Sequence, residues 1–236
     1  MQRIMGYMRK AIQEYKMIEN GDRIAVGISG GKDSLALAAG LAGLRRFIGI
    51  DFTLVGITLD PGWNGQYTDY TPLQQLCEKW EMEYHVIRTE IGPIVFEARE
   101  ESNPCSLCAR MRRGALHDAA KAHGCNKIAL GHHYDDAVET FVMNLFQEGR
   151  IGCFSPVTYL SRKDITMIRP LVFAPEHEIA SAVRKAELPI VKSQCPVDGA
   201  TTREWTKNWL REMEKEHRGI THRIFGAMKR GNISGW

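Results

Sequence analysis

Short apolar runs alternate along this chain with segments whose apolar residues return at helical spacing. Strand-like runs occupy residues 24–28, 52–59, 84–88, 127–130 and 166–172. Between the first two runs, Leu35, Leu37, Leu41 and Leu44 follow a helical pattern. Continuous apolar strands separated by helices are typical of a parallel sheet covered on both faces. The pattern therefore predicts a doubly wound α/β fold, with a mostly parallel sheet of about five strands and helical additions at both termini.

The two ends of the chain differ from this alternating region. The sequence predicts an amphipathic helix over residues 1–20, ending near Asn20 and Gly21, and a helical extension over residues 197–236. No repeat, low-complexity segment or linker divides residues 21–196, which we therefore expect to form the main domain.

The carboxyl-terminal extension carries the basic character of the chain. From Thr201 to Trp236 there are eight Lys or Arg and four Asp or Glu, a balance of +4, against +3 for the whole chain. Trp205 and Trp209 are interleaved with these charges. Basic residues with aromatic neighbours suit a nucleic-acid surface. A helix whose tryptophans face the core explains the same pattern equally well.

Size and composition place the protein in an ordinary class. With 236 residues, 44% of them hydrophobic and 25% charged, the chain resembles a single globular domain. No apolar run approaches the roughly 18 residues that span a bilayer, and the amino terminus lacks the apolar core of a signal peptide. We therefore expect a cytoplasmic protein without a membrane partner, whose six cysteines are thiols or metal ligands.

The most informative motif follows the first strand-like run. Its residues are Ser29, Gly30, Gly31, Lys32, Asp33 and Ser34. A glycine turn between a strand and a helix exposes backbone N–H groups at the positive end of the helix dipole, which suits an anion. Lys32 adds a positive charge, and the two serines add hydroxyl donors. The motif thus predicts a phosphate site, although a turn that only joins strand to helix remains the alternative.

The spacing of this loop separates it from other nucleotide motifs. It has neither the four residues that a Walker A loop places before Gly-Lys-Ser/Thr nor the spacing of G-x-G-x-x-G. It resembles the loop of the ATP pyrophosphatase (PP-loop) superfamily. That resemblance implies an enzyme that holds the pyrophosphate of ATP while a substrate oxygen attacks the α-phosphate.

A second polar motif, Gly131 to Asp136, follows the strand-like run at 127–130. Asp135 and Asp136 stand at the start of a predicted helix over 137–146, where a carboxylate also serves as a helix cap. Capping needs only one carboxylate, and carboxylates near a triphosphate commonly hold Mg²⁺. Both motifs follow strands of one parallel sheet, so we expect them to meet at its carboxyl edge.

The cysteines supply the third signal. Cys105 and Cys108 form a C-x-x-C just ahead of a predicted helix over 110–123, and Cys195 lies in a later loop. One C-x-x-C is ambiguous between zinc, redox chemistry and iron–sulfur ligation. Three thiolates suit a [4Fe–4S] cluster whose fourth iron has no protein ligand. A structural zinc site and a persulfide-forming redox pair remain alternatives.

Together these elements closely resemble the tRNA 2-thiocytidine synthetase family of PP-loop enzymes. The resemblance runs from about Gly21 to Cys195 and is carried by the Ser29–Ser34 loop, Cys105-Ser106-Leu107-Cys108-Ala109-Arg110-Met111-Arg112-Arg113-Gly114, Gly131-His132-His133-Tyr134-Asp135-Asp136 and Ile168-Arg169-Pro170-Leu171. It implies that residues 21–196 form a PP-loop domain with cluster-binding cysteines.

The resemblance also implies roles for individual residues. A [4Fe–4S] cluster is expected on Cys105, Cys108 and Cys195. ATP is expected on the Ser29–Ser34 loop with Gly131 and His132, and adenylation chemistry with Mg²⁺ on Asp135 and Asp136, helped by Lys32 and Asp33. RNA contacts are expected from Arg110, Arg112 and Arg113, and Arg169 is a candidate for phosphate or tRNA contact.

The expected activity is therefore ATP-dependent tRNA thiolation. A base carbonyl, expected to be C2 of a cytidine, is adenylated with release of pyrophosphate, and sulfur delivered at the cluster then replaces the oxygen. The partners are tRNA, a sulfur donor (a cysteine desulfurase or sulfide) and a second copy in a homodimer. Three alternatives stay open: thiolation of a uridine or a small molecule, a non-thiolating adenylating enzyme with structural zinc, and a non-catalytic ATP and iron–sulfur sensor.

Overall fold

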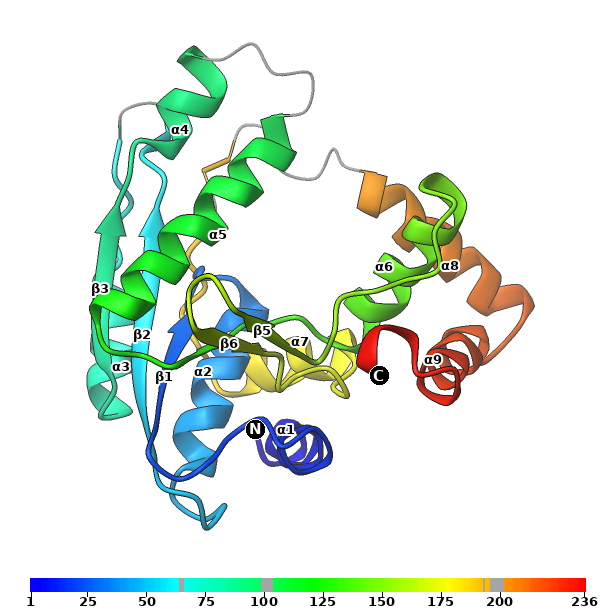
Figure 1. Ribbon diagram of the computed structural model, residues 1–236, viewed down its shortest axis with the longest axis horizontal. Helices are drawn as coiled ribbons and strands as arrows, with labels where there is room; N and C mark the ends of the chain where they lie inside the picture. The colour runs from blue at the N-terminus through cyan, green and yellow to red at the C-terminus, as the bar shows by residue number, and fades with distance from the viewer. Residues whose placement is uncertain (64–65, 99–103, 193, 196–201) are drawn as a thin grey trace.

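A computed structural model describes residues 1–63, 66–98, 104–192, 194–195 and 202–236. In this part of the chain, one sheet has the strand order β3-β2-β1-β4-β6-β5 (Figure 1). All neighbouring strands are parallel except β5 and β6, which run antiparallel. The doubly wound α/β fold predicted from the hydrophobic pattern is confirmed.

The elements follow one another with short connections. The strands are β1 Asp22–Gly27, β2 Phe52–Asp60, β3 Glu83–Arg88, β4 Lys127–Ala129, β5 Val157–Leu160 and β6 Ile165–Ile168. The α-helices are α1 Gln2–Glu14, α2 Lys32–Leu44, α3 Thr71–Lys79, α4 Ile91–Pro93, α5 Pro104–Ala122, α6 Tyr134–Gln147, α7 Glu176–Lys185, α8 Thr202–Glu216 and α9 Ile220–Arg230. A π-helix spans Ile94–Ala98, and a 3₁₀ turn spans Ile233–Gly235.

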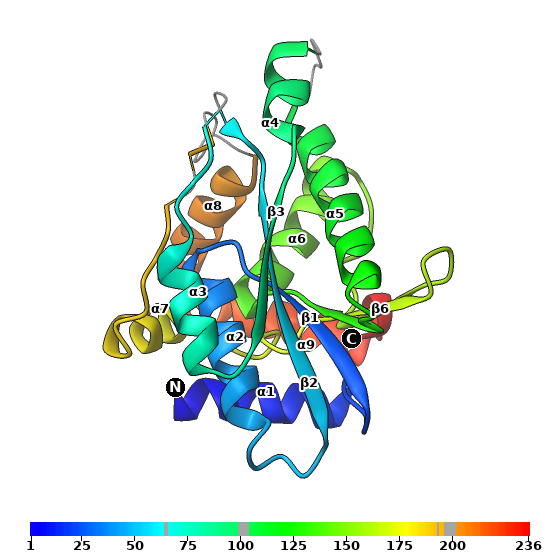
Figure 2. The same cartoon turned by 90° about the vertical axis from the view of Figure 1, so that its left-hand side faces the viewer.

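The sheet is buried on both faces, because helices cover each of them (Figure 2). Along β1, Ile24 and Val26 pack into a large core with α1, α2 and α7. Ala25, between them, faces the opposite way and packs with Ala119 and Ala120 of α5. Alternation of side chains along a strand thus divides β1 between two cores. This explains why the central residues Ile24, Ala25 and Val26 are all apolar.

Four boundaries differ from the expectation. The structure adds β5, an edge strand whose residues are only partly buried and whose pattern is therefore not continuously apolar. The run at 166–172 is a strand only to Ile168, because Val172 closes a turn by donating its N–H to the carbonyl of Arg169. The first helix ends at Glu14, before Lys16 with φ +48°. The C-x-x-C lies inside α5, which begins at Pro104.

The order of the strands fixes where a ligand belongs. The chain moves outward from β1 through β2 to β3, then returns to the other side of β1 to form β4. Such a reversal leaves a crevice at the carboxyl ends of the two inner strands. The phosphate loop follows β1 and the Gly131–Asp136 motif follows β4, so both lie at this crevice. In the described part of the chain, no helix combines the length and the hydropathy that are needed to cross a bilayer.

Candidate functional site: a phosphate loop, a carboxylate motif and a cysteine group

The phosphate loop is held in shape by its own side chains. The Ser34 hydroxyl accepts a hydrogen bond from the Ser29 N–H (3.1 Å) and donates one to the Gly31 carbonyl (2.9 Å). Gly30 has φ +85°, and its carbonyl accepts the Val191 N–H at 3.1 Å. A side chain at Gly30 would meet Val191 at 2.9 Å, so only glycine fits there without strain. The loop is thus preformed.

Direct packing joins the two motifs. A Cβ at Gly131 would meet the backbone of Asp33 and Ser34 at 3.2 Å, tighter than ordinary contact. Glycine at position 131 therefore allows the strand β4 to end against the start of α2. The expectation that the two motifs meet at one edge of the sheet agrees with this placement.

Lys32 lies in a chain of alternating charges. Its Nζ pairs with Asp33 at 3.0 Å and with Glu176 at 3.1 Å, and Glu176 pairs in turn with Lys207 at 2.8 Å. Burial works against the charged form of Lys32, but these carboxylates outweigh it and raise its pKa. Burial also opposes the charge of Glu176, but hydrogen bonds from Lys207 and Lys32 outweigh it and lower its pKa to about 2. The ammonium group of Lys32 is thus kept charged beside the loop.

The carboxylates of the second motif face different ways. His133 and Asp136 form a capping box at the start of α6, because each backbone N–H is accepted by the side chain of the other. Asp136 also accepts a hydrogen bond from Arg203 at 3.1 Å. Asp135 instead accepts the N–H of Glu176 (2.7 Å) at the start of α7. Both aspartates therefore serve as helix caps, and only Asp136 lines the pocket described below.

The carboxylates that converge are those of Asp33 and Asp136. His133 Nε2 lies 3.8 Å from Asp33 Oδ1 and 3.5 Å from Asp136 Oδ2. Asp33 Oδ1 is buried and has no hydrogen-bond partner. An unpartnered buried carboxylate oxygen is costly unless a cation or a ligand meets it. Asp33 is therefore a further candidate Mg²⁺ ligand beside Asp135 and Asp136, the pair expected from the sequence; His133 Nδ1 lies 3.8 Å from Asp135 Oδ2.

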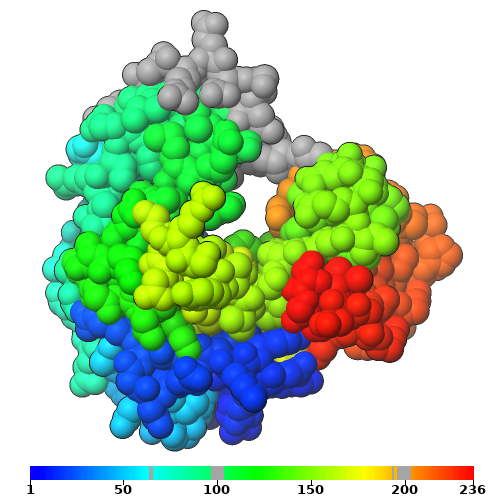
Figure 3. All heavy atoms as spheres, in the orientation of Figure 1, coloured from blue at the N-terminus to red at the C-terminus, as the bar shows by residue number. Residues whose placement is uncertain are grey.

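A pocket of about 450 Å³ opens at the carboxyl ends of β1, β2 and β4. Of the residues expected to act, those that line it are Ser29, Asp33, Ser34, Gly131, His132, Asp136, Arg112 and Arg113. Its apolar wall comes from residues such as Ile57, Leu59 and Leu116. Figure 3 shows the molecule hollowed between α5 and the helices α6 and α8. A cavity with an apolar wall, a phosphate loop and two arginines suits a nucleotide.

Two histidines of the pocket keep unsatisfied ring nitrogens, His117 Nε2 and His132 Nδ1. Burial lowers the pKa of His117, with a further contribution from Arg113. Burial, followed by Arg169, lowers the pKa of His132 to about 4. Both imidazoles are therefore neutral at physiological pH, so each ring offers one donor and one acceptor to a bound ligand.

Arg169 is placed differently from the other expected arginines. Its side chain is only 6% exposed, contacts the Ser155 carbonyl and lies 5.1 Å above the Phe154 ring. Burial lowers its pKa to about 10, so it stays charged. Of the two roles suggested by the sequence, this burial suits contact with a small phosphate ligand, since a tRNA backbone needs an open surface. Arg110, Arg112 and Arg113 are all exposed on α5.

The three expected cluster cysteines gather at the start of α5. Cys108 is buried with Trp63 and Leu107, and Cys195 packs against this group, while Cys105 is exposed. Burial raises the pKa of Cys108, and negative charge on Cys195 and Cys105 raises it further, against the lowering effect of Arg112. The three sulfurs therefore share one neighbourhood, although they come from two distant parts of the chain.

The spacing of these sulfurs bears on the metal. A tetrahedral zinc ion with Zn–S bonds of about 2.3 Å holds its sulfurs about 3.8 Å apart. Within the described residues, no group of three ligand atoms that includes these sulfurs lies within 4.8 Å. The cysteines are thus close but more widely spread than one zinc ion requires.

Five site residues escaped the sequence analysis: His117, Glu139, Glu176, Arg203 and Lys207. Arg203 binds Asp136, Glu139 (3.4 Å) and Thr140 (3.1 Å). Burial and the neighbouring Asp136 raise the pKa of Glu139 to about 7, despite Arg203. Arg203 and Lys207 are four residues apart on α8, so they share one face of that helix. Their spacing was visible in the sequence, but their partners were not.

Comparison with known proteins agrees with the geometry. Residues 5–214 match the family model of the PP-loop domain. The fold, the phosphate loop and the pocket at the reversal of strand order thus define a PP-loop protein. The chain belongs, within that class, to the family of tRNA-cytidine(32) 2-sulfurtransferases.

Relatives with that name match over most of their length. The protein from Geobacter sulfurreducens is 37% identical over 98% of this chain and 90% of its own. The one from Pelobacter propionicus is 41% identical over 88% of this chain and 77% of its own. Among solved structures, the U34-tRNA thiolase NcsA from Methanococcus maripaludis, with its [4Fe–4S] cluster, gives a TM-score of 0.80 at 27% identity, covering 97% of this chain and 77% of that one.

The two loop glycines provide a matched test of the phosphate site. Gly31→Val is expected to abolish ATP binding, because a side chain there keeps phosphate from the backbone of the loop. The melting temperature should change little, because φ at Gly31 is −75° and a Cβ would meet only the Ser29 hydroxyl, at 3.5 Å. Gly30→Ala is expected to lower the melting temperature instead, because of the left-handed φ and the contact with Val191. Calorimetric titration with ATP and thermal unfolding measure the two effects. Normal ATP affinity of Gly31→Val would contradict the phosphate site.

Proposed function

We propose that this protein is an ATP-dependent tRNA sulfurtransferase that converts a cytidine of tRNA to 2-thiocytidine. The observation that carries the proposal is the position of α5. One face of this helix, with Arg112, Arg113 and His117, lines the nucleotide pocket. Cys105 and Cys108 occupy its first turns. Cys108 precedes Arg112 by about one helical turn, so activation and sulfur transfer have neighbouring places on a single rigid element.

The first step is adenylation of the base. The carbonyl oxygen at C2 attacks the α-phosphate of ATP, a P–O bond forms, and the bond to pyrophosphate breaks. The Ser29–Ser34 loop and Lys32 hold the leaving pyrophosphate through backbone N–H groups and positive charge. Asp33 and Asp136 would hold Mg²⁺, which would neutralise charge on the phosphates.

The second step replaces AMP by sulfur at C2, since AMP leaves far more readily than hydroxide. The cysteine group is the proposed site of a [4Fe–4S] cluster, which when bound would supply a coordination position for sulfide. The chain itself has to exclude water from the activated base, because hydrolysis would waste ATP. Trp63, Leu107 and Val95, which are buried around Cys108, provide an apolar surround for this purpose.

The proposed partners are tRNA, a sulfur donor and a second copy of the chain. Exposed Arg110, Arg112 and Arg113 lie beside the cysteines and are proposed to contact the tRNA backbone. Sulfur arrives from a cysteine desulfurase or as sulfide, and the protein works as a homodimer in the cytoplasm, where tRNA and reduced thiols are present. The carboxyl-terminal helices pack on the core in part, since Leu210 and Phe225 are buried in it, while Trp205 is 53% exposed.

The decisive experiment measures ATP cleavage and the modified base together. Anaerobically reconstituted protein is incubated with ATP, sulfide and unmodified tRNA. We expect AMP and pyrophosphate in a tRNA-dependent reaction, and 2-thiocytidine in the nuclease digest by mass spectrometry. Thiouridine in place of thiocytidine would move the assignment to a uridine thiolase. Pyrophosphate without any thiolated base would favour a non-thiolating adenylating enzyme, and no cleavage at all would favour a sensor.

Arg203 is expected to position the catalytic carboxylate. Arg203→Ala should lower the adenylation rate by about 10- to 100-fold, the usual effect of removing a group that orients a metal ligand. The physical reason is that Asp136 and Glu139 lose the cation between them. Arg211→Ala, on the same helix but hydrogen-bonded to Asn208, is the matched control. Equal pyrophosphate release by wild type and Arg203→Ala would remove Arg203 from the site.

A further inference from the structure

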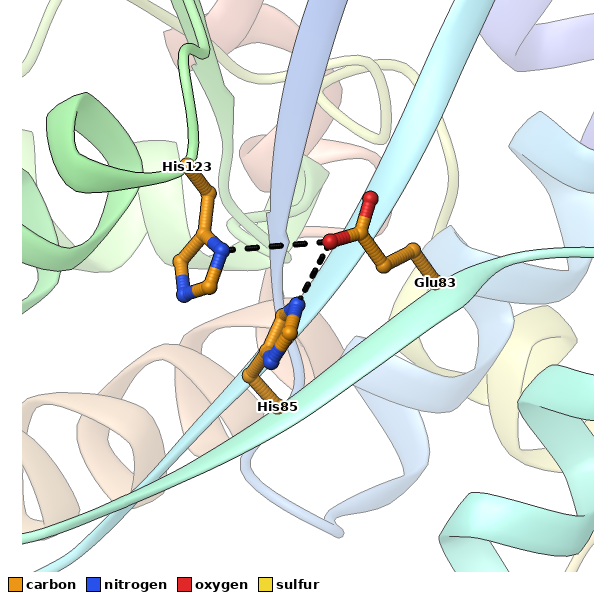
Figure 4. A group of neighbouring side chains, drawn as sticks. All are labelled: Glu83, His85 and His123. Carbon is orange, nitrogen blue, oxygen red and sulfur yellow. Dashed lines mark hydrogen bonds and ion pairs between the residues drawn. The ribbon is translucent and has the colours of Figure 1, made fainter.

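Outside the nucleotide pocket, two histidines and a glutamate converge at the opposite end of α5. Glu83 and His85 stand two residues apart on β3, so their side chains share one face of the strand. His123 follows the last residue of α5. Figure 4 shows a ring nitrogen of each histidine directed at the Glu83 carboxylate. We propose that Glu83, His85 and His123 form a binding site for a divalent transition-metal ion, with Zn²⁺ as the ion that fits best.

The donor atoms match this ion in kind and in spacing. One donor atom from each residue lies within 4.8 Å of the other two. His85 Nε2 is 2.7 Å and His123 Nδ1 is 3.9 Å from Glu83 Oε1. In a tetrahedral zinc site with bonds of about 2.0–2.1 Å, donor atoms are about 3.4 Å apart. Each of these two contacts therefore has to change by less than 1 Å.

The ring orientation also has to change, and the site has room for it. The two imidazole rings are stacked, with centroids 3.7 Å apart and an interplanar angle of 24°. A metal ion binds imidazole in the plane of the ring, so the rings must open further from parallel. The side chains of His85 and His123 are 31% and 26% exposed, so solvent borders both rings. The two rings can separate by rotation of the His85 and His123 side chains, without movement of the strand β3.

Arg23 contacts two of the three proposed ligands without binding the metal ion itself. Arg23 of β1 pairs with the other oxygen of Glu83, Oε2, and leaves Oε1 for the metal ion. Its Nε also donates to the carbonyl of His123 at 2.8 Å. Such outer contacts fix the orientation of metal ligands.

Imidazole and carboxylate ligands favour zinc over magnesium or calcium, which prefer oxygen alone. Three protein ligands leave a fourth position for water, and the Glu83 side chain is 43% exposed. The ion would join the edge strand β3 to the end of α5, whose 19 residues span about 28 Å. The site is thus well separated from the cysteine group at the start of that helix.

The test uses zinc itself with the cluster-loaded protein, in the absence of ATP and tRNA. Wild type, His85→Ala, His123→Ala, Glu83→Gln and the exposed-residue control His222→Ala are dialysed against buffered Zn²⁺, and zinc per chain is determined. We expect one more zinc ion in wild type and in His222→Ala than in the other three. Cys108→Ala should keep this zinc ion, which separates the site from the cysteine group.

Thermal unfolding supplies a second readout. At a hundredfold excess of Zn²⁺ over its Kd, the melting temperature of wild type should rise by roughly 5–10 °C, because the ion binds only the folded state. The rise should vanish in His85→Ala and in His123→Ala, and should reverse with EDTA in wild type. Equal zinc content and equal shifts in wild type and both histidine variants would overturn the proposal. Neither readout depends on thiolation, so the proposed function stands or falls separately.

Discussion

Alanine at Cys105, Cys108 or Cys195 is expected to abolish tRNA thiolation and to leave ATP binding within about twofold of wild type. The physical reason is that the sulfurs form one group at the start of α5, whereas the phosphate loop belongs to β1 and α2. Removing one of three thiolates from an iron–sulfur site removes a third of its protein ligands. Iron and sulfide analysis after anaerobic reconstitution should give about four irons for wild type and much less for each variant.

Cys77, Cys125 and Cys153 provide matched controls from the same chain. Cys77 and Cys125 are buried in apolar cores. Burial raises the pKa of Cys153 to about 12, so this thiol is a poor metal ligand. Alanine at each of these positions should leave the iron content unchanged. One tightly held zinc ion and no iron in the anaerobically handled wild type would contradict the cluster and the proposed delivery of sulfur.

The sheet was predictable where burial on both faces demands a continuous apolar run. The central residues of β1, Ile24, Ala25 and Val26, pack into two cores on opposite faces, so all three are apolar. β5 gave no such signal, because an edge strand is exposed on one side and carries Tyr159 at 61% exposure. Periodicity reports burial, and the short, partly buried β5 therefore gives a weaker signal than the inner strands.

The site was predictable where a local motif carries its own chemistry. Loops that follow parallel strands end at one edge of the sheet, so the phosphate loop and the Gly131–Asp136 motif had to be neighbours. The direction of each carboxylate was not predictable. Asp135 turns to the N–H of Glu176 only because tertiary packing places the start of α7 beside it. Arg203 likewise reaches Asp136 across 67 residues of sequence, which no local pattern encodes.

This difference between the two aspartates leads to a prediction with a large effect. Asp136→Asn is expected to lower pyrophosphate release by at least about a hundredfold, because a metal-assisted charge stabilisation of several kcal/mol is lost. Asp136 lines the pocket and lies near the unpartnered Asp33 oxygen. The amide keeps the size of the side chain, and its oxygen can still accept the His133 N–H that closes the capping box. The fold should therefore survive.

Asp135→Asn should behave differently, because that carboxylate caps α7 through the Glu176 N–H and is placed away from the pocket. An amide oxygen can also accept this hydrogen bond, so we expect at most a modest loss of stability and a small change in rate. Pyrophosphate release at saturating ATP, measured against added Mg²⁺, separates the two roles. A raised Mg²⁺ requirement in Asp136→Asn alone supports the pair Asp33 and Asp136. The same requirement in Asp135→Asn alone would restore Asp135 as the metal ligand.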